Sequence, residues 1–267
     1  MNACTIAARL YDRIHRILRK IRYGCYQKSW VECRENKERL KRAREQFRGG
    51  VKNEEPLVSV LVPTYNRGEI LMQRAIPSVL KQTYQNFEVI IVGDHCTDNT
   101  EKLITNLGDK RLKFYNLPKR GEYPVNPDDR WRVAGVVPVN KAIELSSGEW
   151  MAHLDDDDEF SENHIEVLLN YALEHDYELV YGKVEREIEP GKWIELGSYP
   201  LKEGRISHLS VLYNSRIKFF KYDIDAWKCL EPTDWNRWKR MKEAGVRIGF
   251  IDKVVGKHYL EKTQQGI

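Results

Sequence analysis

The sequence lacks the features of a membrane-spanning protein and those of a small disulfide-built protein. No apolar run approaches the roughly 18 residues that a membrane-spanning helix needs. Basic residues also interrupt the N-terminal segment too often for a secretion signal. The five cysteines are scattered, without a CxxC pair or a zinc-type spacing, which argues against a disulfide scaffold or a structural zinc site. We therefore expect reduced cysteines and a cytoplasmic protein that at most adsorbs to the inner face of a membrane.

The net charge of +4 conceals two different parts of the chain. Residues 1–50 hold 14 Lys and Arg against 5 Asp and Glu, a net charge of +9, which leaves 30 against 35, a net charge of −5, for the remainder. Residues 1–50 therefore form a basic extension, which we expect to be helical.

Apolar residues recur at helical spacing through residues 5–22 and predict an amphipathic basic helix. These residues are Ile6, Leu10, Ile14, Ile17 and Ile21. Such a helix suits an anionic membrane surface or a protein partner. A nucleic-acid partner is not expected, because neither interleaved aromatics nor a nucleic-acid-binding fold accompanies the charge.

From residue 57 onward, short apolar runs alternate with helical patterns. Strands are predicted at 57–63, 87–94, 112–117 and 149–155, and helices at 70–82, 98–107 and 138–147. This alternation is typical of an α/β fold with a Rossmann-like, mostly parallel sheet that helices cover on both faces. After residue 160 we expect a helix at 161–175, a strand pair that turns at Pro190-Gly191, a helix from about Asp234 to residue 244, and two short final strands within 246–259.

Three of the predicted strands end in polar residues. They are followed by Pro63-Thr64-Tyr65, by Gly93-Asp94 and by the run Asp155–Asp158. The carboxyl ends of parallel strands share one edge of the sheet, and ligands bind beyond that edge. The sequence therefore predicts a ligand site there.

The stretch LDDDDEF at 154–160 is the most informative part of that edge. On an extended chain alternate residues point the same way, so Asp155 and Asp157 would share a side and Asp156 would turn towards solvent. One carboxylate could ligate a hard divalent ion, Mn²⁺ or Mg²⁺, which an anionic diphosphate would complete. The alternative is an acidic loop that favours the start of helix 161–175, with Ser161 as its N-cap.

Three segments in this order resemble the signatures of family 2 glycosyltransferases with the glycosyltransferase-A fold: VSVLVPTYNR (58–67), FEVIIVGDHCTDNT (87–100) and NKAIELSSGEWMAHLDDDDEF (140–160). The likeness covers most of 57–160 and continues more weakly through EPTDWNRWKRM (231–241). It implies a metal-dependent, inverting transfer of a sugar from a nucleoside-diphosphate sugar, such as a UDP-sugar, to a glycan or lipid-linked acceptor. Residues 57–160 would bind the donor, and residues 161–267 the acceptor.

The resemblance also implies roles for individual residues. Asp155 would lie with the donor, and Asp157 would ligate the metal. Apart from the resemblance, Asp156 is counted with the donor-binding residues, and Arg120, in the basic loop after the third predicted strand, would neutralise the diphosphate or be a solvated loop charge. In two respects the chain departs from the family pattern: Gly93 stands where the family usually has a first acid beside Asp94, and Asp156 stands where the family often has a small residue. The residues implied for the nucleobase and ribose are Pro63, Thr64, Tyr65, Arg67 and Asp94.

Two further residues late in the chain have candidate roles. Asp234, in EPTDW, resembles the family's catalytic base, which must take the proton of the acceptor hydroxyl; Glu231 is the substitute. Asp234 or Thr233 would also be a good N-cap for the helix that follows. His258 would be an additional metal ligand, or a partly buried residue of a terminal strand.

Two other functions are compatible with these motifs. A nucleotidyltransferase of similar fold would want a glycine-rich phosphate loop after the first strand, whereas PTYNRGE holds one glycine. A non-catalytic nucleotide- or glycan-binding protein would keep the same cavity without turnover.

Overall fold

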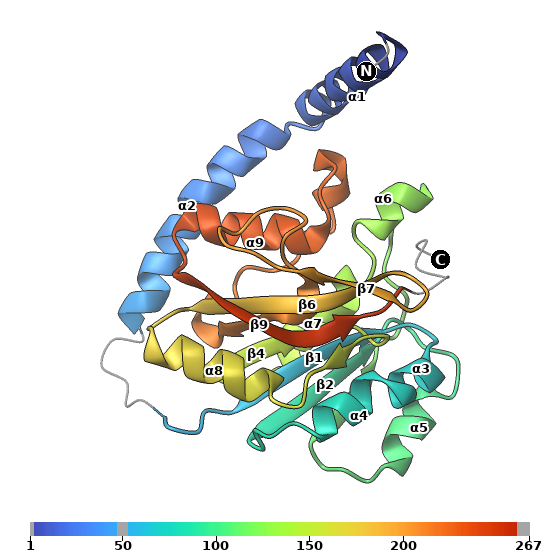
Figure 1. Cartoon of the computed structure of the whole chain (residues 1–267), viewed down its shortest axis with the longest axis vertical. Helices are drawn as coiled ribbons and strands as arrows, with labels where there is room; N and C mark the ends of the chain where they lie inside the picture. Colours follow the sequence, from blue (N-terminus) through green and yellow to red (C-terminus); the bar gives the residue numbers. More distant parts are fainter. Residues whose placement is uncertain (1–2, 47–52, 261–267) are drawn as a thin grey trace.

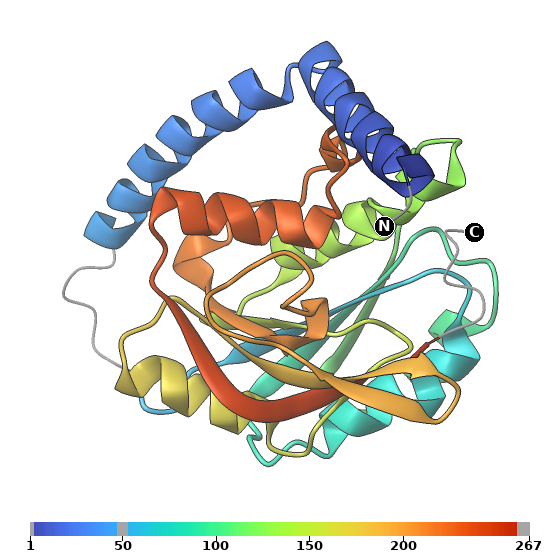
Figure 2. The same ribbon diagram turned by 45° about the horizontal axis from the view of Figure 1, so that its top comes forward.

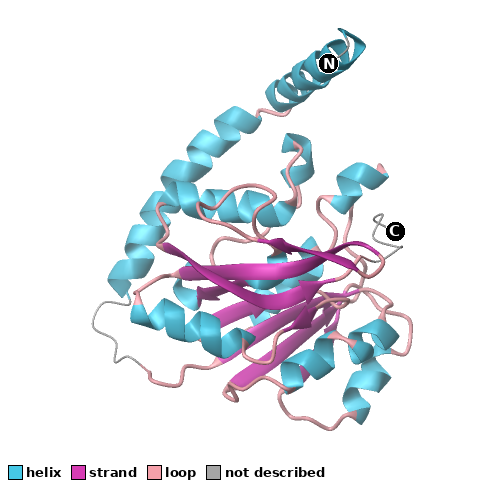
Figure 3. Ribbon diagram, viewed as in Figure 1, coloured by secondary structure: helices cyan, strands magenta, loops and turns pink. Residues whose placement is uncertain are grey.

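The computed structural model describes residues 3–46 and 53–260, and the side chains of the first helix from Arg13 onward. A mixed nine-stranded sheet forms its centre, in the order β3-β2-β1-β4-β8-β6-β9-β5, with β7 paired to β6 (Figures 1 and 3). The strands are β1 (Val58–Thr64), β2 (Phe87–Gly93), β3 (Leu112–Asn116), β4 (Trp150–His153), β5 (Glu159–Phe160), β6 (Leu179–Glu189), β7 (Lys192–Leu196), β8 (Val211–Asn214) and β9 (Ile248–His258).

The first four strands form the parallel part that the sequence predicts. β1 pairs in parallel with β2 and β4, and β2 pairs in parallel with β3. Every residue of β2 and β4 is buried, as expected for strands that are covered on both faces. The carboxyl ends of β1, β2 and β4 therefore meet at one edge.

The rest of the sheet is mixed. β8 runs antiparallel to both β4 and β6, while β9 runs parallel to β6. The two strands expected within 246–259 are one continuous strand, β9. Its pairing with β6 shifts register twice, between Tyr181 and Glu185, and such irregularities let a strand bend without ending.

Helices cover both faces of the sheet (Figures 1 and 2). Alternate residues of the strands supply the two layers: Leu61 belongs to the core beneath α7 and α9, whereas Val60 and Val62 belong to the core beneath α3, α4 and α8. The helices of the body are α3 (Gly68–Gln73), α4 (Ala75–Leu80), α5 (Thr100–Asn106), α6 (Pro127–Trp131), α7 (Val136–Leu145), α8 (His164–Glu174) and α9 (Thr233–Ala244).

The helix predicted at 70–82 is two short helices. They break at Arg74, whose φ of −121° and ψ of −74° are not helical. Pro77 explains the break, because it lacks an N–H and its ring would clash with the Gln73 carbonyl of a continuous helix.

The expected N-cap of the helix at 161–175 is wrong. Helix α8 begins after Asn163 rather than at a cap on Ser161, and Asn163 makes no capping side-chain hydrogen bond.

The basic extension forms two helices, α1 (Ala3–Arg22) and α2 (Cys25–Gln46), which bracket α9 in Figure 2. Helix α2 belongs to the body, since Leu40 is buried and Arg44 makes a bidentate ion pair with Glu178, at 2.8 and 2.7 Å. Helix α1 continues beyond the body in Figure 1. Within the described residues, no helix is both long and apolar enough to cross a membrane.

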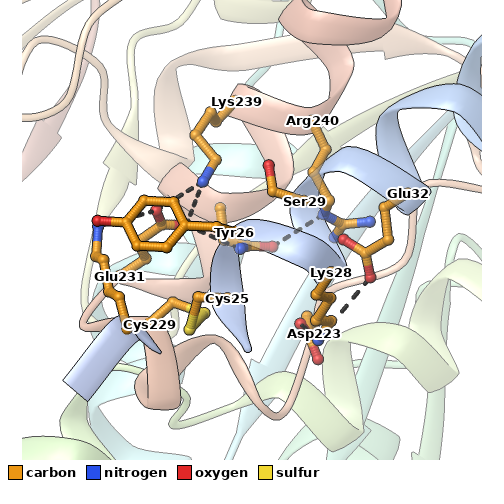
Figure 4. Close-up of a pocket in the computed structure, with 12 residues that line it drawn as sticks. Cys25, Tyr26, Lys28, Ser29, Glu32, Asp223, Cys229, Glu231, Lys239 and Arg240 are labelled. Carbon is orange, nitrogen blue, oxygen red and sulfur yellow. Dashed lines mark hydrogen bonds and ion pairs between the residues drawn. A yellow bond between two sulfur atoms is a disulfide. The ribbon is translucent and has the colours of Figure 1, made fainter. Parts of the chain in front are cut away.

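The expectation of reduced cysteines is wrong for one pair. Cys25, the first residue of α2, forms a disulfide with Cys229 of the 3₁₀ helix η3 (Ala226–Cys229), beside a cavity of about 200 Å³ (Figure 4). The two residues are 204 positions apart. No local spacing could reveal the pair, because only the fold brings them together.

We predict that His164 makes the fold sensitive to acid. Its ring stacks on Phe160, and its Nδ1 lies 2.7 Å from the Val255 carbonyl. Burial lowers the pKa of His164 to about 3, so the folded state resists a proton that the unfolded chain accepts near pH 6.5. Stability should fall by about 1.4 kcal/mol per pH unit below pH 6.5, or about 2 kcal/mol at pH 5.

Urea denaturation of the wild type and His164→Asn at pH 7.5 and pH 5 tests this prediction. The variant should lose less stability between the two pH values than the wild type does. His175→Asn, at the exposed end of α8, is the control and should keep the wild-type pH dependence. An equal loss in the wild type and His164→Asn would contradict the prediction.

Candidate active site

A cavity of about 630 Å³ lies at the carboxyl ends of β1, β2 and β4. We call it the donor cavity, after the nucleoside-diphosphate sugar donor that the family resemblance implies. The three polar strand ends line it together, as the sequence predicts. Among the predicted site residues, ten line this cavity and Asp234 does not; the ten are Pro63, Thr64, Tyr65, Arg67, Asp94, Arg120, Asp155, Asp156, Asp157 and His258.

The aspartate run, residues 155–158, forms a turn rather than an extended strand, and we call it the acidic turn. β4 ends at His153, and the N–H of Asp158 donates to the carbonyl of Asp155 at 3.2 Å. The alternation of an extended chain therefore stops before the second aspartate. The expectation that Asp156 faces solvent is wrong: it is 6% exposed, and one of its oxygens accepts a 2.7 Å hydrogen bond from Thr64 Oγ1.

Arg67 balances the two central carboxylates of this turn. Its Nη1 lies 3.0 Å from Asp156 Oδ1, and its Nη2 lies 3.0 Å from Asp157 Oδ2. Burial still raises the pKa of Asp156 to about 7. The turn thus concentrates negative charge that a single guanidinium only partly offsets, which is the electrostatic character of a cation site.

Each outer carboxylate of the turn has a histidine partner. Asp155 Oδ1 lies 3.1 Å from His208 Nδ1, and Asp158 Oδ2 lies 2.8 Å from His258 Nδ1. Burial opposes a charge on His258, but the contact with Asp158 outweighs it and raises the pKa of His258 to about 9. Both histidines are therefore fixed in orientation by a carboxylate.

The residues present fit a metal ion that needs a ligand to complete its coordination. In the described ranges, 3–46 and 53–260, no three His, Cys, Asp or Glu side chains converge as a metal site. Asp157 and His258 both line the donor cavity, and a carboxylate on the second ring nitrogen is the usual support of a metal-binding histidine. Two protein ligands of this kind leave most positions to a bound oxyanion.

Asp94 organises the wall of the donor cavity at the end of β2. It is buried at the end of β2, where its oxygens accept hydrogen bonds from the Gly121 N–H at 2.8 Å and from the Tyr123 hydroxyl at 2.7 Å. The Arg120 guanidinium lies 3.8 Å from the centre of the Tyr65 ring. A flat aromatic face and an acceptor therefore lie together, which suits a nucleobase.

Geometry explains why Gly93 replaces an acid. A Cβ at this position would lie 2.7 Å from Asn116 Oδ1 and 3.0 Å from Cys96 Sγ. Asn116 is held there, because its side chain accepts from the Cys96 N–H and donates to the Cys96 carbonyl, each at 2.8 Å. No side chain fits at position 93 in this arrangement.

Asp234 lies in the first turn of α9, outside the lining of the donor cavity but close to the acidic turn. Burial raises the pKa of Asp234. The charge of His208 acts in the opposite direction, and the charge of Asp155 raises the pKa further. Its Oδ1 accepts from the Trp235 N–H at 2.6 Å. Glu231, the substitute, instead binds Lys239 at 2.6 Å and lines the small cavity of Figure 4.

A buried polar cluster behind the acidic turn was missed by the sequence reasoning. The Tyr222 hydroxyl lies 2.8 Å from His208 Nε2 and 3.1 Å from His153 Nε2, and Arg237 Nη1 lies 3.1 Å from the same hydroxyl. Arg237 is 0% exposed, in van der Waals reach of the rings of Tyr213 and Tyr222. The sign of this cluster in the sequence was Arg237 itself, an arginine one helical turn after Asp234, on the face of α9 that is buried.

Comparisons with known proteins identify the family and the fold of the chain. The family model for glycosyl transferase family 2 matches residues 59–126 and 129–237. TarP of Staphylococcus aureus, a poly(ribitol-phosphate) beta-N-acetylglucosaminyltransferase, is 32% identical over 160 residues, which are 59% of this chain and 45% of TarP. The chain spans less than half the length of TarP and the other curated relatives compared, from 18% to 46%.

Solved structures share the fold at low sequence identity. TarS of S. aureus, residues 1–349 in complex with UDP-GlcNAc, superposes with a TM-score of 0.59 and 20% identity, over 77% of this chain and 59% of that one. A mannosyltransferase of Pyrobaculum calidifontis, in complex with GDP-Man and Mn²⁺, gives a TM-score of 0.58 and 14% identity, over 92% and 70%. The expected fold and family are confirmed: the chain belongs to the family 2 glycosyltransferases and has their glycosyltransferase-A fold.

Proposed function

We propose that the protein transfers a sugar from a nucleoside-diphosphate sugar, preferably a UDP-sugar, to a hydroxyl of a glycan or lipid-linked acceptor, in the synthesis of a surface polysaccharide or glycoconjugate. The observation that carries this proposal is that Asp155, Asp156 and Asp157 of the acidic turn line one cavity together with Asp94, at the carboxyl ends of the parallel strands. The UDP-GlcNAc bound by TarS and the polymer substrate in the name of TarP support the donor and the product class.

Donor binding follows from the two walls of the donor cavity. Asp94, Tyr65 and Arg120 form the wall that suits the nucleobase and ribose, and residues 155–157 form the wall that suits the diphosphate and the sugar. Asp157 and His258 would hold Mn²⁺ or Mg²⁺, which when bound neutralises the charge of the departing nucleoside diphosphate. The Mn²⁺ in the mannosyltransferase complex supports a metal of this kind.

Asp234 is the proposed base, on the acceptor side of the chain, residues 161–267. Its buried carboxyl has a raised pKa, which makes it a better proton acceptor than an ordinary exposed aspartate. The substitute, Glu231, is already bound to Lys239. His208 is a positioning residue, since it holds Asp155 and is itself held by Tyr222. The beta linkage in the name of TarP supports inversion at the anomeric carbon.

Asp157→Ala should strongly reduce metal-dependent turnover. Removing the carboxylate takes one of two protein ligands from the ion, so transfer or hydrolysis of a UDP-sugar in the presence of Mn²⁺ should fall on the order of 100-fold. Asp109→Ala, which removes a carboxylate paired with Arg111 away from the donor cavity, is the matched control and should keep full activity.

Measurements on the wild type with and without EDTA complete this experiment. Turnover that stays near the wild-type rate in EDTA or in Asp157→Ala would refute the metal assignment. Tight Mn²⁺-dependent nucleotide binding without turnover of any nucleotide sugar would instead favour a non-catalytic binding protein. Pyrophosphate release from a nucleoside triphosphate would favour a nucleotidyltransferase.

Asp234→Asn should separate catalysis from donor binding. The amide keeps the size of the side chain but cannot take a proton, so kcat should fall by about 10² to 10⁴, while the donor dissociation constant from calorimetry stays unchanged. Glu231→Gln is the matched control and should retain wild-type kcat. Near-wild-type turnover in Asp234→Asn, or a loss in Glu231→Gln instead, would sink the assignment of Asp234.

A further inference from the structure

We propose that α1 docks the protein onto an anionic membrane surface. The docking surface is an outward-facing apolar row with arginines beside it: Ile14, Ile17, Leu18 and Ile21, with Arg13, Arg16 and Arg22. The docking does not require the transfer reaction. Its use for a lipid-linked acceptor, however, rests on the proposed function.

The orientation of α1 is the first argument. The helix contacts the body through its basic side: Arg19 Nη2 lies 2.8 Å from Asp129 Oδ1 of α6 and 3.1 Å from the Trp227 carbonyl, and Lys20 Nζ lies 4.0 Å from Glu231. An amphipathic helix that packs to stabilise the fold turns its apolar face toward the core. Helix α1 instead turns its apolar face away from the body.

The exposure of the apolar row is the second argument. Ile14, Ile17, Leu18 and Ile21 are 48%, 42%, 59% and 61% exposed. Their spacing, i, i+3, i+4 and i+7, places all four on one face of the helix. Among the described residues, none of the four belongs to a buried hydrophobic core or packs against one. A continuous apolar row of this kind marks an interaction surface rather than scattered surface residues.

The charge pattern selects the occupant. From Arg13 to Val31 the chain has six Lys and Arg and no acid, and Arg13, Arg16 and Arg22 are exposed. A helix with an apolar face and basic flanks buries the apolar side chains at the acyl boundary while its cations meet anionic headgroups. The exposed Trp30 that follows on α2 is of a type enriched at that interface.

The same charges disfavour a second copy of the chain. Pairing two such faces would bring each set of arginines against its equal, and like charges across an interface cost binding energy. An anionic bilayer satisfies the apolar row and the arginines at once, without a shape-matched partner.

The position of α1 connects this surface to the active site. Arg19 holds Asp129 of α6, and the next two residues of α6, Arg130 and Trp131, line the donor cavity. Figures 1 and 2 both show α1 and α6 on the same side of the sheet. Docking would therefore bring the membrane surface to the side of the molecule that carries this rim of the cavity.

Flotation of the full chain with lipid vesicles tests the proposal. The wild type should float at low salt with phosphatidylcholine vesicles that contain phosphatidylglycerol, and not with phosphatidylcholine alone. Leu18→Glu should weaken vesicle binding by about tenfold or more, and Arg13→Glu with Arg16→Glu should do so without touching the apolar row. The control is Leu107→Glu, which makes the same change at an exposed leucine that ends α5, and it should bind like the wild type.

Three results would overturn the proposal: no flotation of the wild type with anionic vesicles, equal flotation with neutral ones, or a dimer in light scattering that Leu18→Glu dissociates. UDP-sugar hydrolysis without vesicles is measured on the same proteins and should be unchanged in Leu18→Glu. Lost flotation with intact hydrolysis refutes only the docking. Flotation without hydrolysis of any donor refutes only the proposed function.

Discussion

The structure is arranged around a turn of four consecutive aspartates, three of which are buried. Asp156, Asp157 and Asp158 are at most 6% exposed, and buried carboxylates cost several kcal/mol each unless they are paired and hydrogen-bonded. Every one has a protein counter-group, and these come from three distant parts of the chain: Arg67 just before α3, His208 before β8, and His258 at the end of β9. The acidic turn is therefore where the two halves of the sheet are joined electrostatically.

A second layer of polar groups supports the first. Arg237 is buried without a carboxylate among its hydrogen-bond partners described here, and it binds the Phe220 carbonyl, the Tyr222 hydroxyl and His153. Three aromatic rings surround its guanidinium, an environment that tolerates a cation without neutralising it. Tyr222 in turn makes a hydrogen bond with His208, and His208 makes one with Asp155. Helix α9 thus positions the acidic turn as well as Asp234.

Much of the parallel half of this fold could be predicted, because β1, β2 and β4 are apolar runs that end abruptly in polar residues. The rest depended on tertiary contacts. The alternation rule misplaced Asp156 because the chain turns at Asp155. A run of aspartates also suits a turn, but the apolar run before it favoured the continuation of a strand. His208 and the Cys25–Cys229 pair lie in stretches without periodicity, so only the folded chain reveals them. The break before α4 was the exception, since Pro77 was visible in the sequence.

The crowding at Gly93 has an evolutionary consequence. Asn116 occupies the space of a side chain there, and it is tied to Cys96 by two hydrogen bonds. A second acid beside Asp94 would need room that Asn116 and Cys96 must first vacate, and any single change at position 93 meets both. A second acid therefore cannot be gained at position 93 by one substitution in this arrangement, and its gain would require coupled changes at Asn116 or Cys96.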